Sequence, residues 1–185
     1  MALEALLNRY SLGGKYLSAP GPSDSELEQI IEAALRAPDH CDLVPFRVAA
    51  VAGASRERLA NLFESYARSS GKNEESCQIE RERALSTPLS LAVIGRIDMN
   101  HPIVPAHEQW ISVGGAITNM LNAIHMLGYA GKMLSGGKVR DKAIIDAFCG
   151  PGEVLVGWLV VGTPVRPVNK KSQKLPSECL SFFKE

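Results

Sequence analysis

Three short apolar runs constrain the fold of this chain more than any other feature. They cover residues 46–52, 89–95 and 153–162, and the first is bounded by Pro45 and Gly53. Runs of this length, closed by turn residues, are typical of buried β-strands. Stretches with helical spacing separate the runs. This alternation predicts an α+β sandwich in which helices cover a small central sheet.

The stretches between the runs have apolar residues at the spacing of an α-helix. One of them, residues 24–36, follows Ser23 and includes Ser25, and either residue can supply the N-cap oxygen. The longest, residues 108–127, is apolar on more than one face, and its Gly114 and Gly115 allow another backbone to approach closely. This pattern predicts the centre of a large core or a subunit interface, so we expect a dimer. The other predicted helices cover residues 3–10, 56–67 and 139–148.

The segment 69–83 is polar and highly charged. A charge run of this kind is usually a solvated surface, so we expect an exposed loop and helix face rather than a motif that binds a partner.

Length and charge limit the class of protein. A chain of 185 residues with 45% hydrophobic and 22% charged content predicts one domain, residues 1–185, with a substantial core. The 20 Lys and Arg residues balance the 20 Asp and Glu residues, so we expect neither nucleic acid nor a membrane as a partner. No apolar run approaches the roughly 20 residues that span a bilayer, and the N-terminal segment is amphipathic rather than signal-like. We therefore expect a cytoplasmic protein.

Metal and thiol chemistry have little support in the sequence. The four cysteines are widely separated and form no C-x-x-C pair. The histidines at positions 101, 107 and 125 lack metal-ligand spacing with carboxylates or cysteines, so no metal is expected. Cys41 next to His40 leaves a thiol nucleophile as a minor alternative.

A helix-to-loop corner at Arg36-Ala37-Pro38-Asp39-His40 is a candidate binding element. Pro38 pushes the residue before it out of helical geometry, which places Arg36 and His40 beside the end of a helix. The chain contains neither the G-x-G-x-x-G fingerprint after a strand nor a G-x-x-x-x-G-K-[ST] loop. A nucleotide, if bound, is therefore held in another way.

Four segments in order across nearly the full chain resemble the nitroreductase family and, within it, the short bacterial single-domain subgroup. These segments are Asn8-Arg9-Tyr10-Ser11, the 36–40 corner with the following Pro45-Phe46, Glu108-Gln109 at the start of the longest predicted helix, and Gly162-Thr163-Pro164.

The resemblance implies a three-layer sandwich with a small, mostly antiparallel central sheet. It also implies a homodimer that binds FMN, takes electrons from NAD(P)H and passes them to a nitroaromatic, a quinone or a related acceptor. No catalytic side chain is expected, because the cofactor carries the hydride chemistry. The residues implied to bind the cofactor are Arg9, Tyr10, Ser11, Lys15, Arg36, His40, Met133, Leu134, Ser135 and Gly136.

The chain departs from the family pattern at several of these positions. Tyr10 stands where the family has a second arginine, and the basic residue expected soon after the serine is displaced to Lys15. Met133 and Leu134 replace a tryptophan-arginine pair, so one cation is lost, and Lys138 or Arg166 is a candidate for its replacement. The alternative function is therefore a flavin-binding or structural homologue without turnover.

Overall fold

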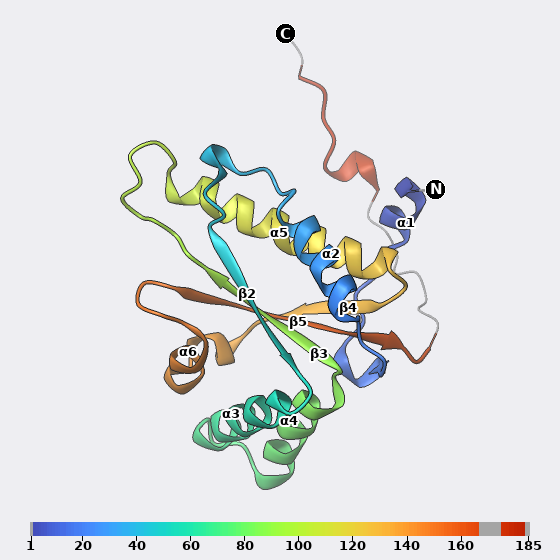
Figure 1. Ribbon diagram of the computed structural model, residues 1–185, viewed down its shortest axis with the longest axis vertical. Helices are drawn as coiled ribbons and strands as arrows, with labels where there is room; N and C mark the ends of the chain where they lie inside the picture. The colour runs from blue at the N-terminus through green and yellow to red at the C-terminus, as the bar shows by residue number, and fades with distance from the viewer. Residues whose placement is uncertain (1, 167–174, 184–185) are drawn as a thin grey trace.

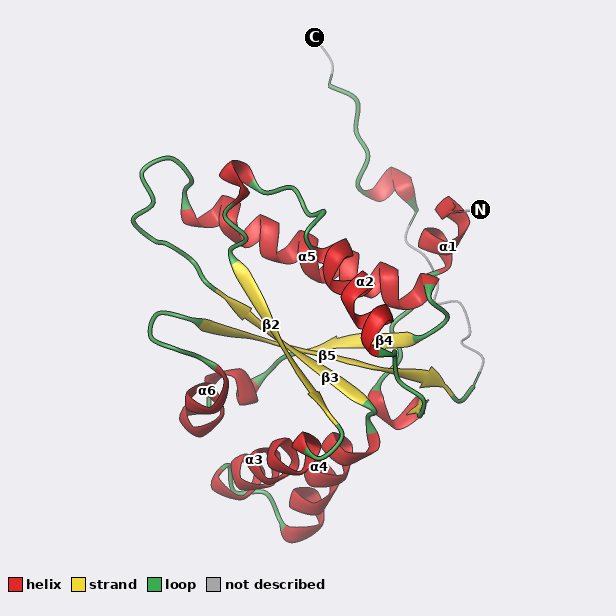
Figure 2. Cartoon of the chain, viewed as in Figure 1, coloured by secondary structure: helices red, strands yellow, loops and turns green. Residues whose placement is uncertain are grey.

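The computed structural model describes residues 2–166 and 175–183 (Figures 1 and 2). The helices are α1 (Ala2–Asn8), α2 (Asp24–Ala34), α3 (Ser55–Ser69), α4 (Glu74–Ser86), α5 (Ala106–Met126) and α6 (Lys142–Phe148). The strands are β1 (Leu17–Ser18), β2 (Phe46–Ala52), β3 (Leu89–Gly95), β4 (Ala130–Leu134) and β5 (Val154–Pro164). Short 3-10 turns are η1 (Gly14–Tyr16), η2 (His40–Asp42), η3 (Gly137–Arg140) and η4 (Pro176–Glu178).

In the described part of the chain, the strands form one five-stranded sheet in which all named pairings are antiparallel. Strand β5 is the centre: it pairs with β3 on one side and with β4 on the other, and β3 also pairs with β2. β1 pairs with the last two residues of β5. The α+β fold predicted from the sequence is confirmed.

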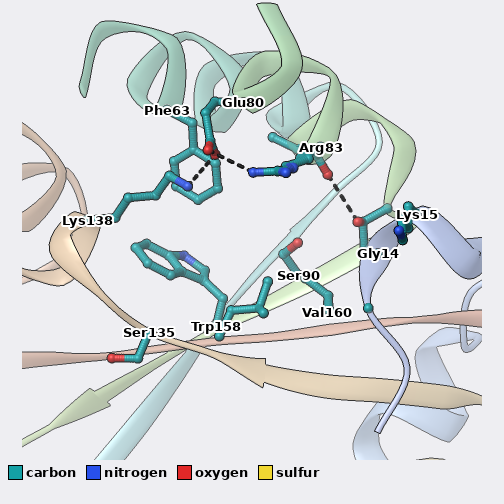
Figure 3. Close-up of a pocket in the computed structure, with 14 residues that line it drawn as sticks. Gly14, Lys15, Phe63, Glu80, Arg83, Ser90, Ser135, Lys138, Trp158 and Val160 are labelled. Carbon is teal, nitrogen blue, oxygen red and sulfur yellow. Dashed lines mark hydrogen bonds and ion pairs between the residues drawn. The ribbon is translucent and has the colours of Figure 1, made fainter. Parts of the chain in front are cut away.

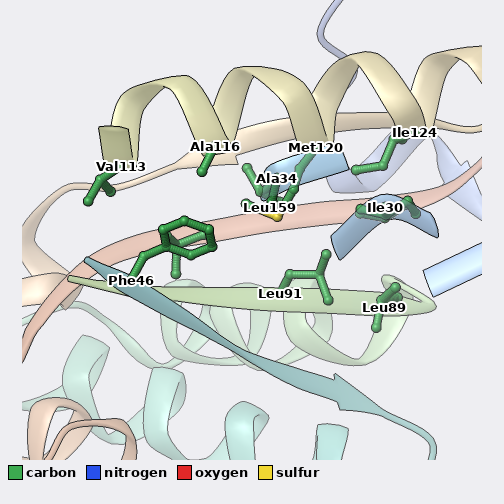
Figure 4. Packing of buried hydrophobic residues seen from close by; sticks show 12 residues of the cluster. Ile30, Ala34, Phe46, Leu89, Leu91, Val113, Ala116, Met120, Ile124 and Leu159 are labelled. Carbon is green, nitrogen blue, oxygen red and sulfur yellow. The ribbon is translucent and has the colours of Figure 1, made fainter. Parts of the chain in front are cut away.

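One face of the sheet is covered by α2 and α5 (Figure 1). Ile30 and Ala34 of α2 and Met120 and Ile124 of α5 pack against Leu91 of the sheet (Figure 4). Apolar burial at this interface is the main stabilising contribution of the layer, at about 25 cal/mol per Å² of apolar surface.

Helix α2 begins where the capping pattern predicts. The Ser23 hydroxyl accepts from the Glu26 backbone N–H, and the Glu26 side chain accepts from the Ser23 N–H at 2.8 Å. The helix ends at Ala34, two residues before the predicted end, because Leu35 already closes the last turn ahead of Pro38.

The other face of the sheet is covered by α3, α4 and α6 (Figures 1 and 2). Leu59 and Phe63 of α3, Ala84 of α4 and Ile144 of α6 pack on Trp158 of β5 and its neighbours in a second buried cluster. Phe63 and Trp158 meet edge to face, with ring centroids 5.2 Å apart. Helices on both faces of one sheet give the three layers of the sandwich.

The prediction of an exposed surface for residues 69–83 is wrong in part. The segment enters α4, which packs against α3 and buries Cys77, Glu80 and Ala84. These three positions are spaced as one face of a helix, but two of the three side chains are small and one is charged. The usual hydrophobic signal of a buried helix face is therefore absent.

The contact between β4 and β5 depends on a glycine. Gly157 has φ +153°, and a Cβ at this position would overlap the carbonyl oxygen of Leu134. The register between β3 and β5 shifts between Val93 and Ile94, beside the same glycine. This irregularity sets the position of the end of β4 and of the loop after it.

No helix in the described residues is long and apolar enough to cross a membrane.

Candidate functional site

A cavity of about 310 Å³ lies between the sheet and helices α3 and α4 (Figure 3). Its size is within the range of sites that hold small molecules. Segments far apart in the chain line it: the 13–15 turn, α3, α4, the end of β4 with the following loop, and strands β3 and β5. The lining includes the apolar side chains of Phe63 and Leu134 and the polar or charged ones of Lys15, Glu80 and Ser135.

The Glu80 carboxylate is the electrostatic centre of the cavity. Glu80 is 4% exposed and forms ion pairs with Lys72 at 2.9 Å, Arg83 at 2.8 Å and Lys138 at 2.5 Å. Burial alone would raise the pKa of Glu80. Hydrogen bonds from Lys138 and Lys72, together with the nearby charges, outweigh burial and lower this pKa from 4.5 to about 2. Glu80 is therefore ionised at neutral pH and orients the cations around it.

Lys138 reaches Glu80 from the loop that follows β4. Its ammonium lies 2.5 Å from the carboxylate and 4.4 Å from the centre of the Phe63 ring, a cation–π distance. In Figure 3 the Lys138 and Arg83 side chains reach the carboxylate from different sides. The turn before Lys138 needs glycine, because Gly136 has φ +117° and a Cβ on Gly137 would overlap the Tyr66 hydroxyl.

The indole of Trp158 also lines the cavity, next to the charged cluster (Figure 3). Trp158 is 3% exposed, and its Nε1 is buried without a hydrogen-bond partner among the described residues. Buried polar groups in native proteins almost always have a partner, so this indole N–H is available to an acceptor in the cavity.

A second group of cations lies at the end of β5. The guanidinium of Arg166 lies 3.5 Å from the centre of the Tyr16 ring, and the Lys15 ammonium lies 4.7 Å from it. A hydrogen bond with Lys15, supported by the charge of Arg166, lowers the pKa of Tyr16. Lys15 also lines the cavity, so it links this group to the site.

The N-terminal residues implied by the resemblance run beside β4. Ser11 forms a parallel bridge with Gly131, and the next residue, Leu12, donates its N–H to the Gly131 carbonyl at 3.1 Å. The Tyr10 ring packs edge to face on His125 of α5, with centroids 5.6 Å apart. Arg9 and Tyr10 are half-buried, and neither they nor Ser11 line the cavity.

Arg36 and His40 lie with the layer of α2 and α5, and they do not line the cavity on the other face of the sheet. His40 Nδ1 is 2.8 Å from Glu108 Oε2 at the start of α5, so a carboxylate orients this imidazole. The loop that carries His40 has positive φ at Cys41, Asp42 and Val44, an uncommon conformation for residues other than glycine.

The structure thus separates the ten predicted cofactor residues into groups. Lys15, Leu134 and Ser135 line the cavity, and Met133 and Gly136 are their immediate neighbours in the chain. Sequence reasoning did not assign Glu80, Arg83 or Trp158 to the site. The only local signal for Glu80 was its place between Cys77 and Ala84 on one helix face.

Among the described residues, no group of three or more His, Cys, Asp or Glu side chains could hold a metal ion.

Comparison with known proteins identifies the family. The model of the nitroreductase family matches residues 6–163. YdjA of Escherichia coli (strain K12), which is provisionally named an NAD(P)H nitroreductase, is 33% identical over 164 residues, which is 88% of each chain. The chain belongs to the nitroreductase family. A Haemophilus influenzae protein with the same provisional name is 29% identical over 178 residues, 96% of each chain.

Solved structures of nitroreductase-like proteins share the fold. A nitroreductase-like protein from Bacillus cereus superposes with a TM-score of 0.84 at 18% identity, over 100% of this chain and 97% of the other. A Desulfovibrio desulfuricans protein that is provisionally named a nitroreductase, solved in complex with FMN, has a TM-score of 0.74 at 19% identity, over 99% and 96% of the two chains. The predicted nitroreductase-like sandwich is confirmed.

Proposed function

We propose that this chain is an FMN-dependent NAD(P)H oxidoreductase that reduces a nitroaromatic, a quinone or a related acceptor. The nitroreductase family and the relatives named for NAD(P)H support the oxidoreductase class. The observation that carries the proposal in this molecule is the cavity at the end of β4. It combines apolar walls, a fixed cationic cluster and the unpartnered N–H of Trp158.

The residues present fit a flavin ring. The ring is flat and largely apolar and carries carbonyl oxygens along one edge. Phe63 and Leu134 offer apolar surface to its body, while Trp158 offers a donor to an oxygen acceptor. Gly14 lets the 13–15 turn pack closely against Thr87 in the cavity wall, because a Cβ there would come within 2.8 Å of the Thr87 hydroxyl oxygen.

The phosphate of FMN needs cations and hydroxyl donors outside the cavity. We assign this role to Arg9 and Ser11, with Arg166 as a further cation, whereas Lys15 lines the cavity itself. Guanidinium groups bind phosphate with two parallel hydrogen bonds, and a serine hydroxyl adds a third donor. Met133, Leu134, Ser135 and Gly136 would then lie along the ring, as the resemblance implies.

Bound FMN would supply the hydride chemistry, taking electrons from NAD(P)H and giving them to the acceptor. The protein residues bind and orient the reactants. Glu80 keeps Lys138 and Arg83 in position, and residues of α3 and α4 form one wall of the cavity. No side chain has to act as a nucleophile.

We propose a homodimer, because several of the predicted cofactor residues do not line the cavity of their own chain. Arg36, Tyr10 and His40 do not reach the cavity within the chain, so a second copy is needed if Arg36 and His40 contact the cofactor. Apolar side chains available for such an interface are exposed on α1 and α5, namely Leu3, Leu7, Ile111 and Met126. Light scattering on the purified protein, showing twice the chain mass of 20.0 kDa, tests this point.

The site of action we propose is the cytoplasm, a reducing compartment. The four cysteines of the chain are free, which suits such a compartment.

The visible absorption spectrum of the purified protein tests the function. With FMN added and oxygen removed, we expect a bound-flavin spectrum that bleaches when NADH or NADPH is added. A flavin spectrum that neither nucleotide bleaches would favour the alternative, a flavin-binding homologue without turnover. Protein that neither retains FMN nor gains thermal stability from it would contradict the proposal.

A further inference from the structure

We propose that Trp158 and Lys138 form an inner subsite of the cavity, which receives the carbonyl-bearing edge of the flavin ring and favours the ring when it is negatively charged. The inference rests on the proposed function and extends it to two residues whose places in the site depend on the fold. Trp158 comes from β5 and Lys138 from the η3 turn, so neither is part of the four segments that resemble the family.

The indole N–H of Trp158 is unpaired in the described part of the chain. Trp158 is 3% exposed, and its Nε1 has no partner among the described residues. Burying a donor without an acceptor is unfavourable. A ligand in the cavity with an oxygen next to Nε1 removes this cost, so the subsite selects ligands with an acceptor at their inner edge.

The cavity lining carries an excess of positive charge. Lys15, Arg83 and Lys138 line the cavity with a single carboxylate, Glu80. Glu80 also pairs with Lys72, so one negative charge is shared among several cations. The Lys138 ammonium is fixed between Glu80 and the Phe63 ring, so it needs no rearrangement when a ligand enters.

The flavin ring is neutral when oxidised and negatively charged after it accepts a hydride. Transfer of a hydride from NAD(P)H to a neutral ring adds two electrons and one proton, so the ring gains one negative charge and NAD(P)⁺ is released. A fixed, partly desolvated cation attracts the charged ring more strongly than the neutral one. Reduced FMN should therefore bind more tightly than oxidised FMN, which raises the midpoint potential of the bound cofactor.

The test measures the midpoint potential of bound FMN and the dissociation constant of oxidised FMN. The variants are Lys138→Met, Lys138→Gln, which keeps a donor for Glu80, and Trp158→Phe. Lys142→Met is the matched control, because this exposed lysine pairs with its neighbour Asp146 on α6 and does not line the cavity. Circular dichroism and thermal unfolding show that each variant is folded.

Both Lys138 variants should weaken the binding of reduced FMN about tenfold more than that of oxidised FMN. For a two-electron couple this ratio lowers the potential by about 30 mV. Trp158→Phe should weaken the binding of oxidised FMN about tenfold, and Lys142→Met should match the parent in both measurements.

The outcomes separate the subsite from the proposed function. Parent protein that binds no FMN would overturn both. If the parent binds FMN and its potential is the same in the folded Lys138 variants, the subsite is rejected while the function stands. An equal loss of affinity for oxidised and reduced FMN in these variants would also reject the subsite, because such a loss would indicate a purely structural role for Lys138.

Discussion

Glu80 Oε2 and Lys138 Nζ lie 2.5 Å apart, although 58 positions separate the two residues in the sequence. Their ion pair joins helix α4 to the turn after β4 across the inner end of the cavity (Figure 3). The same carboxylate also holds Lys72 and Arg83. One buried side chain thus connects the stability of the helical layer to the charge of the candidate site.

Replacing Glu80 by Gln should destabilise the protein by about 3 kcal/mol, because Lys72, Arg83 and Lys138 then lose the buried carboxylate with which they pair. Urea unfolding followed by circular dichroism measures the change. Glu82→Gln is the matched control on the same helix, since Glu82 is exposed, and its effect should stay within about 0.5 kcal/mol. Equal effects of the two substitutions would contradict the central role of Glu80.

The same variant should change the response of stability to acid. The pKa of Glu80 is lowered from 4.5 to about 2, so its ionised form stabilises the folded state above pH 4.5. This contribution is lost as the pH falls from about 4.5 toward 2. The unfolding free energy of the parent should therefore fall more steeply across this window than that of Glu80→Gln. Glu153, whose pKa a hydrogen bond from Arg47 also lowers to about 2, should leave some acid sensitivity in the variant.

Gly157→Ala should cost about 2–4 kcal/mol and weaken FMN binding. The backbone there has φ +153°, and the added methyl group overlaps the Leu134 carbonyl oxygen, so β4 must move away from β5. Denaturant unfolding and FMN titration measure the two effects. Gly150→Ala is the control, because its Cβ would make only an ordinary contact with Glu153 at 3.5 Å. A Gly157→Ala variant as stable as this control would show that the strand contact is not close.

Gly115→Leu should destabilise the protein by about 1–3 kcal/mol through overpacking. A Cβ on Gly115 would lie 3.2 Å from the Cβ of Ala37 and 3.6 Å from the Cδ of Pro38, so α5 lies directly against the 36–40 corner. Gly114 is the matched control, because a Cβ there meets no described atom within 4 Å. Thermal unfolding should separate the two leucine variants, and equal melting temperatures would refute the close packing at Gly115.

Arg9→Ala should weaken FMN binding about 10- to 100-fold while the fold is retained. This loss corresponds to removing a charged hydrogen-bond donor from a phosphate. Riboflavin, which has no phosphate, should bind the variant and the parent equally well. Fluorescence titration with both ligands makes the comparison, and Arg58→Ala, at an exposed position on α3, is the control. Unchanged FMN affinity would reject the assignment of Arg9 to the phosphate.

The strands were predictable because the sheet is covered on both faces. Strands buried on two sides read as continuous apolar runs, and residues 46–52 and 89–95 coincide with β2 and β3. The last run became β5, which extends two residues further, to Pro164. The strand β1 could not be predicted, because two residues are too few to show a periodic pattern in the sequence.

Only those residues of the candidate site that the family resemblance implied could be predicted from the sequence. The family resemblance implied Lys15, Leu134 and Ser135 as cofactor residues, and the fold brings these residues to one cavity. Glu80 was assigned to a solvated surface, because local charge density does not reveal that α3 and the sheet cover that side of α4. Trp158 was visible in the sequence as a strand residue, but its unpaired N–H exists only in the folded arrangement.

The sequence by itself determined the alternation of helices and strands, a serine cap at the start of the helix over residues 24–36, the corner at Pro38 and the family resemblance. These features depend on periodicity and on backbone preferences within about ten residues, which the chain carries locally. The tertiary structure decided which charges are buried, which donors lack a partner and which side chains meet in the cavity. Such properties depend on desolvation and on distances between segments far apart in the chain, as in the pairing of Glu80 with Lys138.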